Sequence, residues 1–60
     1  MKLLDLITFI FNANLICIYG DDIPDIEGYP DNTKFKQYYN RDIDDICSDN
    51  DIIAIKILPE

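Results

Sequence analysis

The chain contains no histidine, only two glycines and only two cysteines. Without histidine, a His-activated nucleophile, a His general base and a His metal ligand are all excluded. Gly20 and Gly28 cannot supply a P-loop or a Gly-x-Gly-x-x-Gly loop. Cys17 and Cys47, with no other Cys or His in the chain, cannot build a zinc site. We therefore expect neither a metal nor a cofactor.

The chain also lacks a long hydrophobic run. Its first twenty residues are mostly apolar, but Asp5, Asn12 and Asn14 interrupt them, so no run reaches the roughly 18 apolar residues that span a membrane. No small-x-small cleavage site follows this segment. We expect no membrane span and a cytoplasmic location in a bacterial host. We also expect reduced thiols; the sequence leaves open whether Cys17 and Cys47 are bridged.

What the chain does have is acidity. Twelve acidic residues face five basic ones, giving a formal net charge of −7, and the first twenty residues are formally neutral. A field of this sign repels nucleic acid and acidic membranes and attracts basic protein surfaces. The chain is also rich in Ile, Asp and Asn, a composition that low-GC coding DNA favours. The acidity is therefore either selected for binding or incidental.

Sixty residues make one domain, residues 1–60, with a marginal core. The apolar share of 48% is too high for a disordered acidic tail. Domains of this size commonly need a disulfide, a metal or a partner subunit as reinforcement. We expect a folded domain that forms a homodimer or a higher oligomer.

Hydrophobic spacing predicts the elements of the N-terminal half. An amphipathic helix is indicated by an apolar stripe at helical spacing, formed by Leu3, Leu4, Ile7, Ile10 and Phe11. The segment Asn12–Asn14 should end it. Residues 15–19 predict a central strand covered on both faces. Residues 21–25 predict a loop because of Pro24, and residues 26–29 a short edge strand.

The C-terminal half predicts a short helix followed by a hairpin. Asp31 or Asn32 is the expected N-cap, and Phe35, Tyr38 and Tyr39 give about two helical turns. Residues 42–48 and 51–58 flank Asp49-Asn50, a tight-turn signal, and predict an antiparallel hairpin. A β-bulge near Asp44-Asp45 would place Ile43 and Ile46 on one side.

Together these elements predict an α+β fold with a three- to four-stranded, mostly antiparallel sheet and helices on one face. The last strand is apolar on both of its faces, so one face needs either a helix or a second copy of the chain as cover. Small size favours the second copy. We take the face with Ile53, Ile55 and Ile57 as the candidate oligomer interface.

The candidate partner-binding residues combine carboxylates of the hairpin with two aromatic anchors: Asp42, Asp44, Asp45, Asp49, Asp51, Tyr38 and Tyr39. Residues two apart in a strand point the same way about 6.6 Å apart, so a row of Asp side chains can imitate a phosphate backbone. Tyr is favoured in interface cores. The alternative is that these charges only keep the protein soluble and its sheet edges unpaired.

Catalytic and ligand-binding alternatives have weaker support. Asp42-Ile43-Asp44 begins like a calcium loop, but a hydrophobe stands at the third ligand position and Cys47 replaces the central Gly. A Mg²⁺-dependent nicking enzyme would need a basic track beside its carboxylates. Lys34, Lys36 and Arg41 form the one cationic cluster, which could serve a sponge for a nucleotide signal. We expect no enzyme.

The chain opens with Met-Lys-Leu-Leu-Asp-Leu-Ile and closes with an Asp-Asn-Asp-Ile-Ile-Ala-Ile-Lys-Ile hairpin. In size, charge and rhythm it resembles the small acidic proteins encoded by phages and prophages of low-GC bacteria. Some of these are anti-defence factors, including anti-CRISPR inhibitors that bind nucleic-acid-binding effectors through acidic surfaces. The resemblance implies that this chain is a phage-type inhibitor of a basic host protein. The inhibitor itself is not expected to bind nucleic acid. The alternative is a homo-oligomeric structural or regulatory phage protein with incidental acidity.

Overall fold

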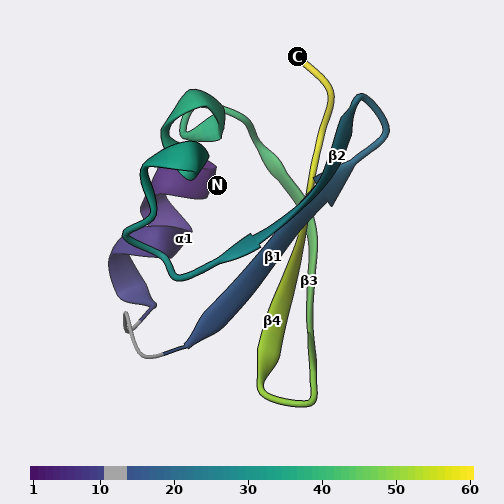
Figure 1. Cartoon of the computed structure of the whole chain (residues 1–60). Coiled ribbons are helices and arrows are strands. Elements are labelled where there is room, and N and C mark those ends of the chain that lie inside the picture. The colour runs from purple at the N-terminus through teal and green to yellow at the C-terminus, as the bar shows by residue number, and fades with distance from the viewer. Residues whose placement is uncertain (11–13) are drawn as a thin grey trace.

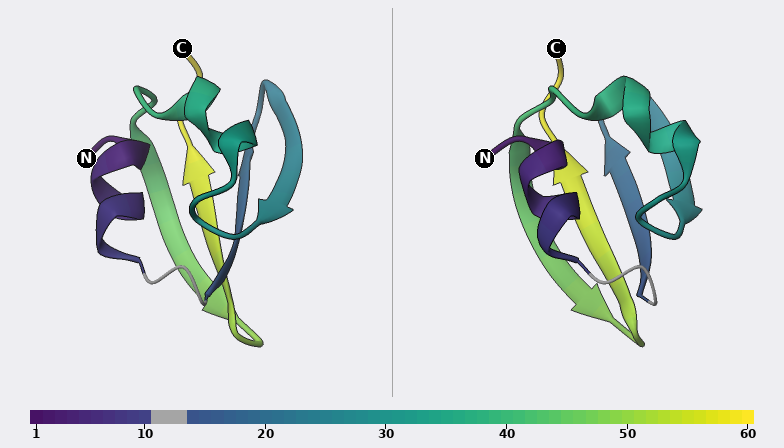
Figure 2. Two further views of the ribbon diagram at one scale, coloured as in Figure 1. Left: turned by 60° about the vertical axis from the view of Figure 1, so that its left-hand side comes forward. Right: turned by 90° about the vertical axis from the view of Figure 1, so that its left-hand side faces the viewer.

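The computed structural model describes residues 1–10 and 14–60 and shows a twisted four-stranded sheet with the helical segments on one side (Figures 1 and 2). The elements are α1 (Leu3–Phe9), β1 (Leu15–Gly20), β2 (Ile23–Gly28), the 3-10 helix η1 (Thr33–Tyr38), β3 (Ile43–Asp49) and β4 (Ile52–Ile57). The predicted α+β class, with an N-terminal helix, a short second helix and a C-terminal hairpin, is confirmed.

Two antiparallel hairpins form the sheet, whose strand order is β2-β1-β4-β3. They join in the middle because β1 and β4 pair in parallel, from Leu15 opposite Ile52 to Tyr19 opposite Lys56. The outer pairs are antiparallel, as predicted. The central parallel pair was not predicted. It arises because the chain returns from the first hairpin to the second through η1 on one face of the sheet (Figure 2).

Helix α1 is short and ends before the predicted Asn signal. An Asp5 carboxylate oxygen accepts a hydrogen bond from the backbone N–H of Lys2 at 3.2 Å, which satisfies a free donor at the helix start. Leu3 is fully buried, while Ile10 is already extended at the C-cap. The predicted contribution of Phe11 and the stop signal at Asn12 fall outside the described residues.

The first hairpin differs from its prediction at Pro24. The prediction of a loop over residues 21–25 is wrong, because Asp21 and Asp22 alone form the turn and β2 already begins at Ile23. Proline is tolerated there because β2 is an edge strand, where a missing N–H costs no ladder bond on the outer side. The predicted edge position of this strand is correct, and the strand is longer than expected.

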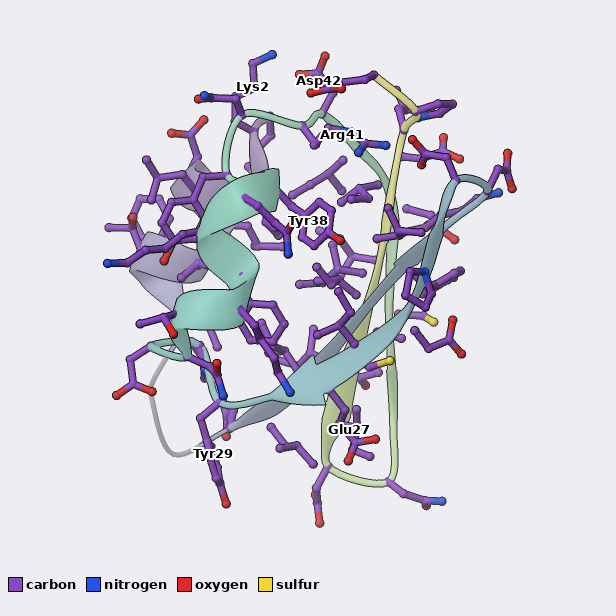
Figure 3. All side chains as sticks on the ribbon, turned by 45° about the horizontal axis from the view of Figure 1, so that its top comes forward. Lys2, Glu27, Tyr29, Tyr38, Arg41 and Asp42 are labelled. Carbon is purple, nitrogen blue, oxygen red and sulfur yellow. The ribbon has the colours of Figure 1, made fainter. Side chains whose placement is uncertain are left out.

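The second helix is a 3-10 helix of six residues. Asn32 is its N-cap, because its side-chain oxygen accepts a hydrogen bond from the backbone N–H of Lys34 at 3.0 Å. Phe35 is fully buried beneath it. Tyr38 points from η1 toward the sheet (Figure 3) and packs with Tyr39 against the edge of the core.

The C-terminal hairpin turns at Asn50 and Asp51, one residue later than predicted, and both have positive φ (49° and 70°). These angles fit a two-residue type I′ turn, in which Asn and Asp are among the best tolerated residues after glycine. The predicted bulge is confirmed. Between Ile43 and Asp45 the register shifts by one residue, so that Ile43 and Ile46 lie opposite Ile57 and Ile55.

The core lies between the sheet and the helices. Six side chains are fully buried there: Leu3, Ile16, Ile18, Phe35, Ile55 and Ile57. Ile53 packs against the same cluster. Ile55 and Ile57 therefore cannot contact a second copy, and the predicted oligomer interface of Ile53, Ile55 and Ile57 is corrected: these residues fix the helices to the sheet.

Arg41 ties together four separate segments of the chain. Its Nε donates to the carbonyl of Leu58 at 2.8 Å, and its Nη2 donates to the carboxylate of Asp22 at 2.7 Å. Its carbonyl accepts from the N–H of Leu3 at 2.9 Å, and the next carbonyl, that of Asp42, accepts from the N–H of Leu58 at 2.8 Å. We call these five residues the Arg41 junction. It holds the N-terminal helix, the β1–β2 turn and the C-terminal tail at one end of the sheet.

Replacing Arg41 is expected to destabilise the fold strongly. The Arg41 side chain is only 8% exposed and its partner Asp22 is 43% exposed, so an Arg41→Met variant leaves a carbonyl and a half-exposed carboxylate without their donor. We expect the free energy of unfolding to fall by about 2–4 kcal/mol. Arg41→Lys should recover part of this loss, because one ammonium cannot satisfy both acceptors in the fork geometry.

Urea denaturation followed by circular dichroism measures this loss. Lys56→Met is the matched control, because it removes a cation whose ion pair with Asp44 is 35% and 44% exposed. That variant should change stability by no more than about 1 kcal/mol. Equal effects of the two substitutions would contradict the role assigned to Arg41.

Candidate interaction surface

The face of the sheet opposite the helices is uncovered by any described element (Figures 1 and 2). Ile16, Ile18 and Ile55 point into the core, so the residues next to them in each strand point to the opposite face. The observed register then identifies the residues of the neighbouring strands that share this opposite face. We call this surface the open face. Its residues are Asp25, Glu27, Leu15, Cys17, Tyr19, Ile52, Ala54, Lys56, Asp44, Asp45 and Cys47.

The middle of the open face is apolar. The apolar strip consists of Leu15, Cys17, Tyr19, Ile52 and Ala54 on the two central strands β1 and β4. All five side chains are half-buried, since neighbouring strands shield them without a covering helix. The prediction that β1 is covered on both faces is therefore wrong for this side, and the surface that lacks cover carries Ile52 and Ala54.

The first margin of the strip is formed by Asp25 and Glu27 on the edge strand β2. Both are exposed, Glu27 lies opposite Cys17 in the ladder, and neither has an ion-pair partner among the described residues. Glu27 projects from β2 away from η1 (Figure 3). Because Asp25 and Glu27 are two residues apart in a strand, their side chains point to the same face with a spacing of about 6.6 Å along the strand. The spacing that we predicted for Asp42 and Asp44 thus occurs at Asp25 and Glu27.

The second margin is formed by the bulge in β3. The register shift sets Asp44 and Asp45 opposite the single residue Lys56. The Asp44 carboxylate lies 3.7 Å from the Lys56 ammonium. With Asp25 and Glu27, the described side chains of the open face include four carboxylates and one ammonium, so the charge is negative on both sides of the apolar strip.

The predicted acidic site does not gather in one place. Asp42 lies beside Lys2 at one end of β3 (Figure 3), with 3.1 Å between the Asp42 carboxylate and the Lys2 ammonium. Asp51 lies in the turn at the other end, about 20 Å away along the strand. The side chain of Asp49 is outside the described part of the structure. Of the four predicted Asp residues whose side chains are described, Asp44 and Asp45 alone lie together on the open face.

The predicted aromatic anchors are also placed differently. Tyr38 and Tyr39 are half-buried against the core on the helical side of the sheet, so they do not lie on the open face with Asp44 and Asp45. Tyr29 is the exposed tyrosine, with 52% of its surface accessible, and it points away from the molecule (Figure 3). Tyr19 is the aromatic residue of the open face.

Both cysteines lie on the open face and both are free thiols. Cys17 and Cys47 lie opposite Ala54 from its two sides, so β4 separates them. Their Cα atoms are about 9.6 Å apart at this strand spacing, beyond the reach of a disulfide. Burial, and then the negative charges of Asp25 and Glu27, raise the pKa of the Cys17 thiol. This thiol is therefore a poor nucleophile at neutral pH.

The predicted cationic cluster is divided. Arg41 is buried in the Arg41 junction, whereas Lys34 and Lys36 are exposed on η1. The described surface contains no pocket between or around these residues. Among residues 1–10 and 14–60, no three Cys, Asp or Glu side chains converge as metal ligands. No helix within those same ranges is long and apolar enough to cross a bilayer.

Comparison of the chain with protein-family models, with curated proteins and with solved structures found no match. The resemblance to small acidic phage proteins therefore stays a prediction.

Sequence reasoning predicted that one apolar face of the last strand would need cover, but it selected the face of Ile53, Ile55 and Ile57, which the structure shows to be the core side. Residues 15–19 and 52–58 are apolar at both parities, and the chain has helical segments enough to cover only one face of a sheet. The sequence could not show which of the two alternating sets of strand residues faces the helices. The buried Ile16 and Ile55 settle it.

The two thiols provide a test of this surface. Cys17 should be alkylated by iodoacetamide more slowly than the exposed Cys47 at neutral pH, because it is half-buried and its pKa is raised. In an Asp25→Asn, Glu27→Gln variant the pKa of Cys17 should fall, so that its alkylation accelerates and its pH–rate profile moves to lower pH. Mass spectrometry of each cysteine peptide measures both rates.

Cys47 is the internal control, because two strands, β1 and β4, lie between it and the substituted carboxylates. Its rate should stay constant in the double variant. An unchanged profile for Cys17 would show that Asp25 and Glu27 do not face it.

Proposed function

We propose that this protein is a non-catalytic interaction protein whose open face binds a basic surface of a partner protein. The observation that carries this proposal is the apolar strip bordered by carboxylates on both sides. Apolar contact supplies the burial that stabilises a complex, and complementary charge steers the encounter and selects the partner. The net charge of −7 adds a long-range field of the same sign.

The size of the domain fits this use of a whole face. A standard interface hides about 800 Å² on each partner. The chain exposes 3971 Å² in all, so such an interface would take about a fifth of its surface. One side of a four-stranded sheet, together with its margins, is a surface of that order.

The resemblance described above points to a class of partner. A host defence or nucleic-acid-processing protein presents Lys and Arg side chains to phosphates, and carboxylates at a regular repeat can occupy the same groups. Asp25 and Glu27 supply such a repeat on β2, and Asp44 and Asp45 supply charge on the opposite margin. If the protein acts by mimicry, DNA or RNA should compete with it for the partner.

An affinity experiment tests the proposal through matched charge variants. Wild type, Ala54→Arg and Gln37→Arg are used as bait with a bacterial lysate at low and high salt, and binding of the captured protein is then measured with purified components. Ala54 lies at the centre of the open face, whereas Gln37 is exposed on η1, so both variants add one positive charge at different places.

We expect Ala54→Arg to weaken binding at least about tenfold and Gln37→Arg to leave it nearly unchanged. Raising the salt from about 50 to about 500 mM should weaken binding of the wild type, because the Debye length falls from about 14 to about 4 Å. Equal effects of the two variants, or an affinity independent of salt, would contradict the proposal. Circular dichroism confirms that each variant is folded.

A further inference from the structure

We infer that the occupant of the open face is an amphipathic α-helix of the partner with basic residues on both flanks, lying along β1 and β4. This inference rests on the proposed function, because it specifies what binds to the same surface. It is argued from the width, length and charge of the face, and from the poor fit of the other occupants.

The width of the apolar strip matches one helix. Neighbouring strands are about 4.8 Å apart, and a helix with its side chains is about 10 Å across, so one helix covers the two central strands. The acidic margins on β2 and β3 then lie beyond its two sides, about 14 Å apart. Lys and Arg side chains can place their stems on the apolar strip and their charges at Asp25, Glu27, Asp44 and Asp45.

The length of the strip sets the length of the helix. β1 and β4 pair over five positions, from Leu15 opposite Ile52 to Tyr19 opposite Lys56. Four steps of a strand span about 13 Å, which corresponds to about nine residues of α-helix. A partner helix of three turns would therefore cover the strip from end to end.

A second copy of this chain fits the open face poorly. If two open faces packed together about a two-fold axis along the strands, β2 of each copy would lie over β3 of the other. If the axis ran across the strands, β2 would lie over β2 and β3 over β3. Both arrangements set carboxylates against carboxylates, with Lys56 as the single cation of the face, and like charges across an interface are unfavourable.

An added β-strand fits poorly as well. The two free edges of the sheet are β2 and β3, which contain Pro24 and the bulge at Asp44 respectively. Proline removes a backbone donor, and a bulge breaks the regular spacing of the ladder, so both edges resist the pairing of a further strand. The chain's own helices are already packed on the other face through Leu3 and Phe35.

Designed peptides test this inference without knowledge of the partner. The probe is a 14-residue Leu/Lys peptide with its leucines at helical spacing. One control has the same composition with leucines at every second position, which favours a strand. A second control keeps the helical spacing and replaces Lys by Glu. Binding to the full chain labelled with ¹⁵N is followed by NMR at low salt.

We expect the helical Leu/Lys peptide to bind at least about tenfold more tightly than either control. Its amide shifts should be largest in residues 15–19 and 52–56, and it should protect Cys17 from alkylation. Ala54→Arg should weaken its binding by about tenfold, while Gln37→Arg, which adds the same charge on η1, should change it less than about twofold.

The inference would be overturned by tighter binding of the strand-forming peptide with shifts along β2 or β3, by shifts on the helical side of the sheet, or by no preference for the helical Leu/Lys peptide. Concentration-dependent dimerisation that removes the open-face signals at neutral pH would assign the face to a second copy. One further outcome is a natural partner that loses binding to Ala54→Arg and yet contacts the open face through a loop or a sheet. That result would contradict the inferred helical occupant and leave the proposed function intact.

Discussion

The fold depends on one buried cation at the point where four segments of the chain meet. Arg41 lies just before β3. Its backbone carbonyl accepts a hydrogen bond from the N–H of Leu3, and its guanidinium donates hydrogen bonds to Asp22 and Leu58. A planar fork can satisfy a carbonyl and a carboxylate in different directions at the same time, which an ammonium on a flexible stem does less well. Because the described core is small, with six fully buried side chains between the sheet and the helices, such a junction supplies order that the core alone cannot.

The junction also determines what remains exposed. It holds the N-terminal segment beside residues 39–43, and the crossover through η1 lies on the same side, so both helices cover one face (Figure 2). The described residues contain no further element for the other face. Leu15, Ile52 and Ala54 therefore stay half-buried at the centre of a surface that the fold itself does not use.

The sequence predicted the order of elements well, because hydrophobic spacing and turn residues are local signals. The bulge could be predicted because Ile43 and Ile46 would point to opposite faces of a regular strand, and an extra residue between them places both apolar side chains on the same face. The site was predicted less well. The burial of Ile55 and the half-burial of Ile52 depend on where the helices pack, and the pairing of Asp42 with Lys2 joins residues that lie far apart in the sequence. Such long-range contacts leave no pattern in a single sequence.

The acidity of the open face counteracts the tendency to self-associate that its apolar strip creates. An uncovered sheet face with half-buried Leu and Ile side chains tends to associate with copies of itself. Carboxylates on both margins oppose that association, because a two-fold axis along the strands or across them brings like charges together. The same charges attract a basic surface. Under the proposed function, one set of residues would both oppose self-association and select a partner of opposite charge, and both effects would weaken together as salt rises.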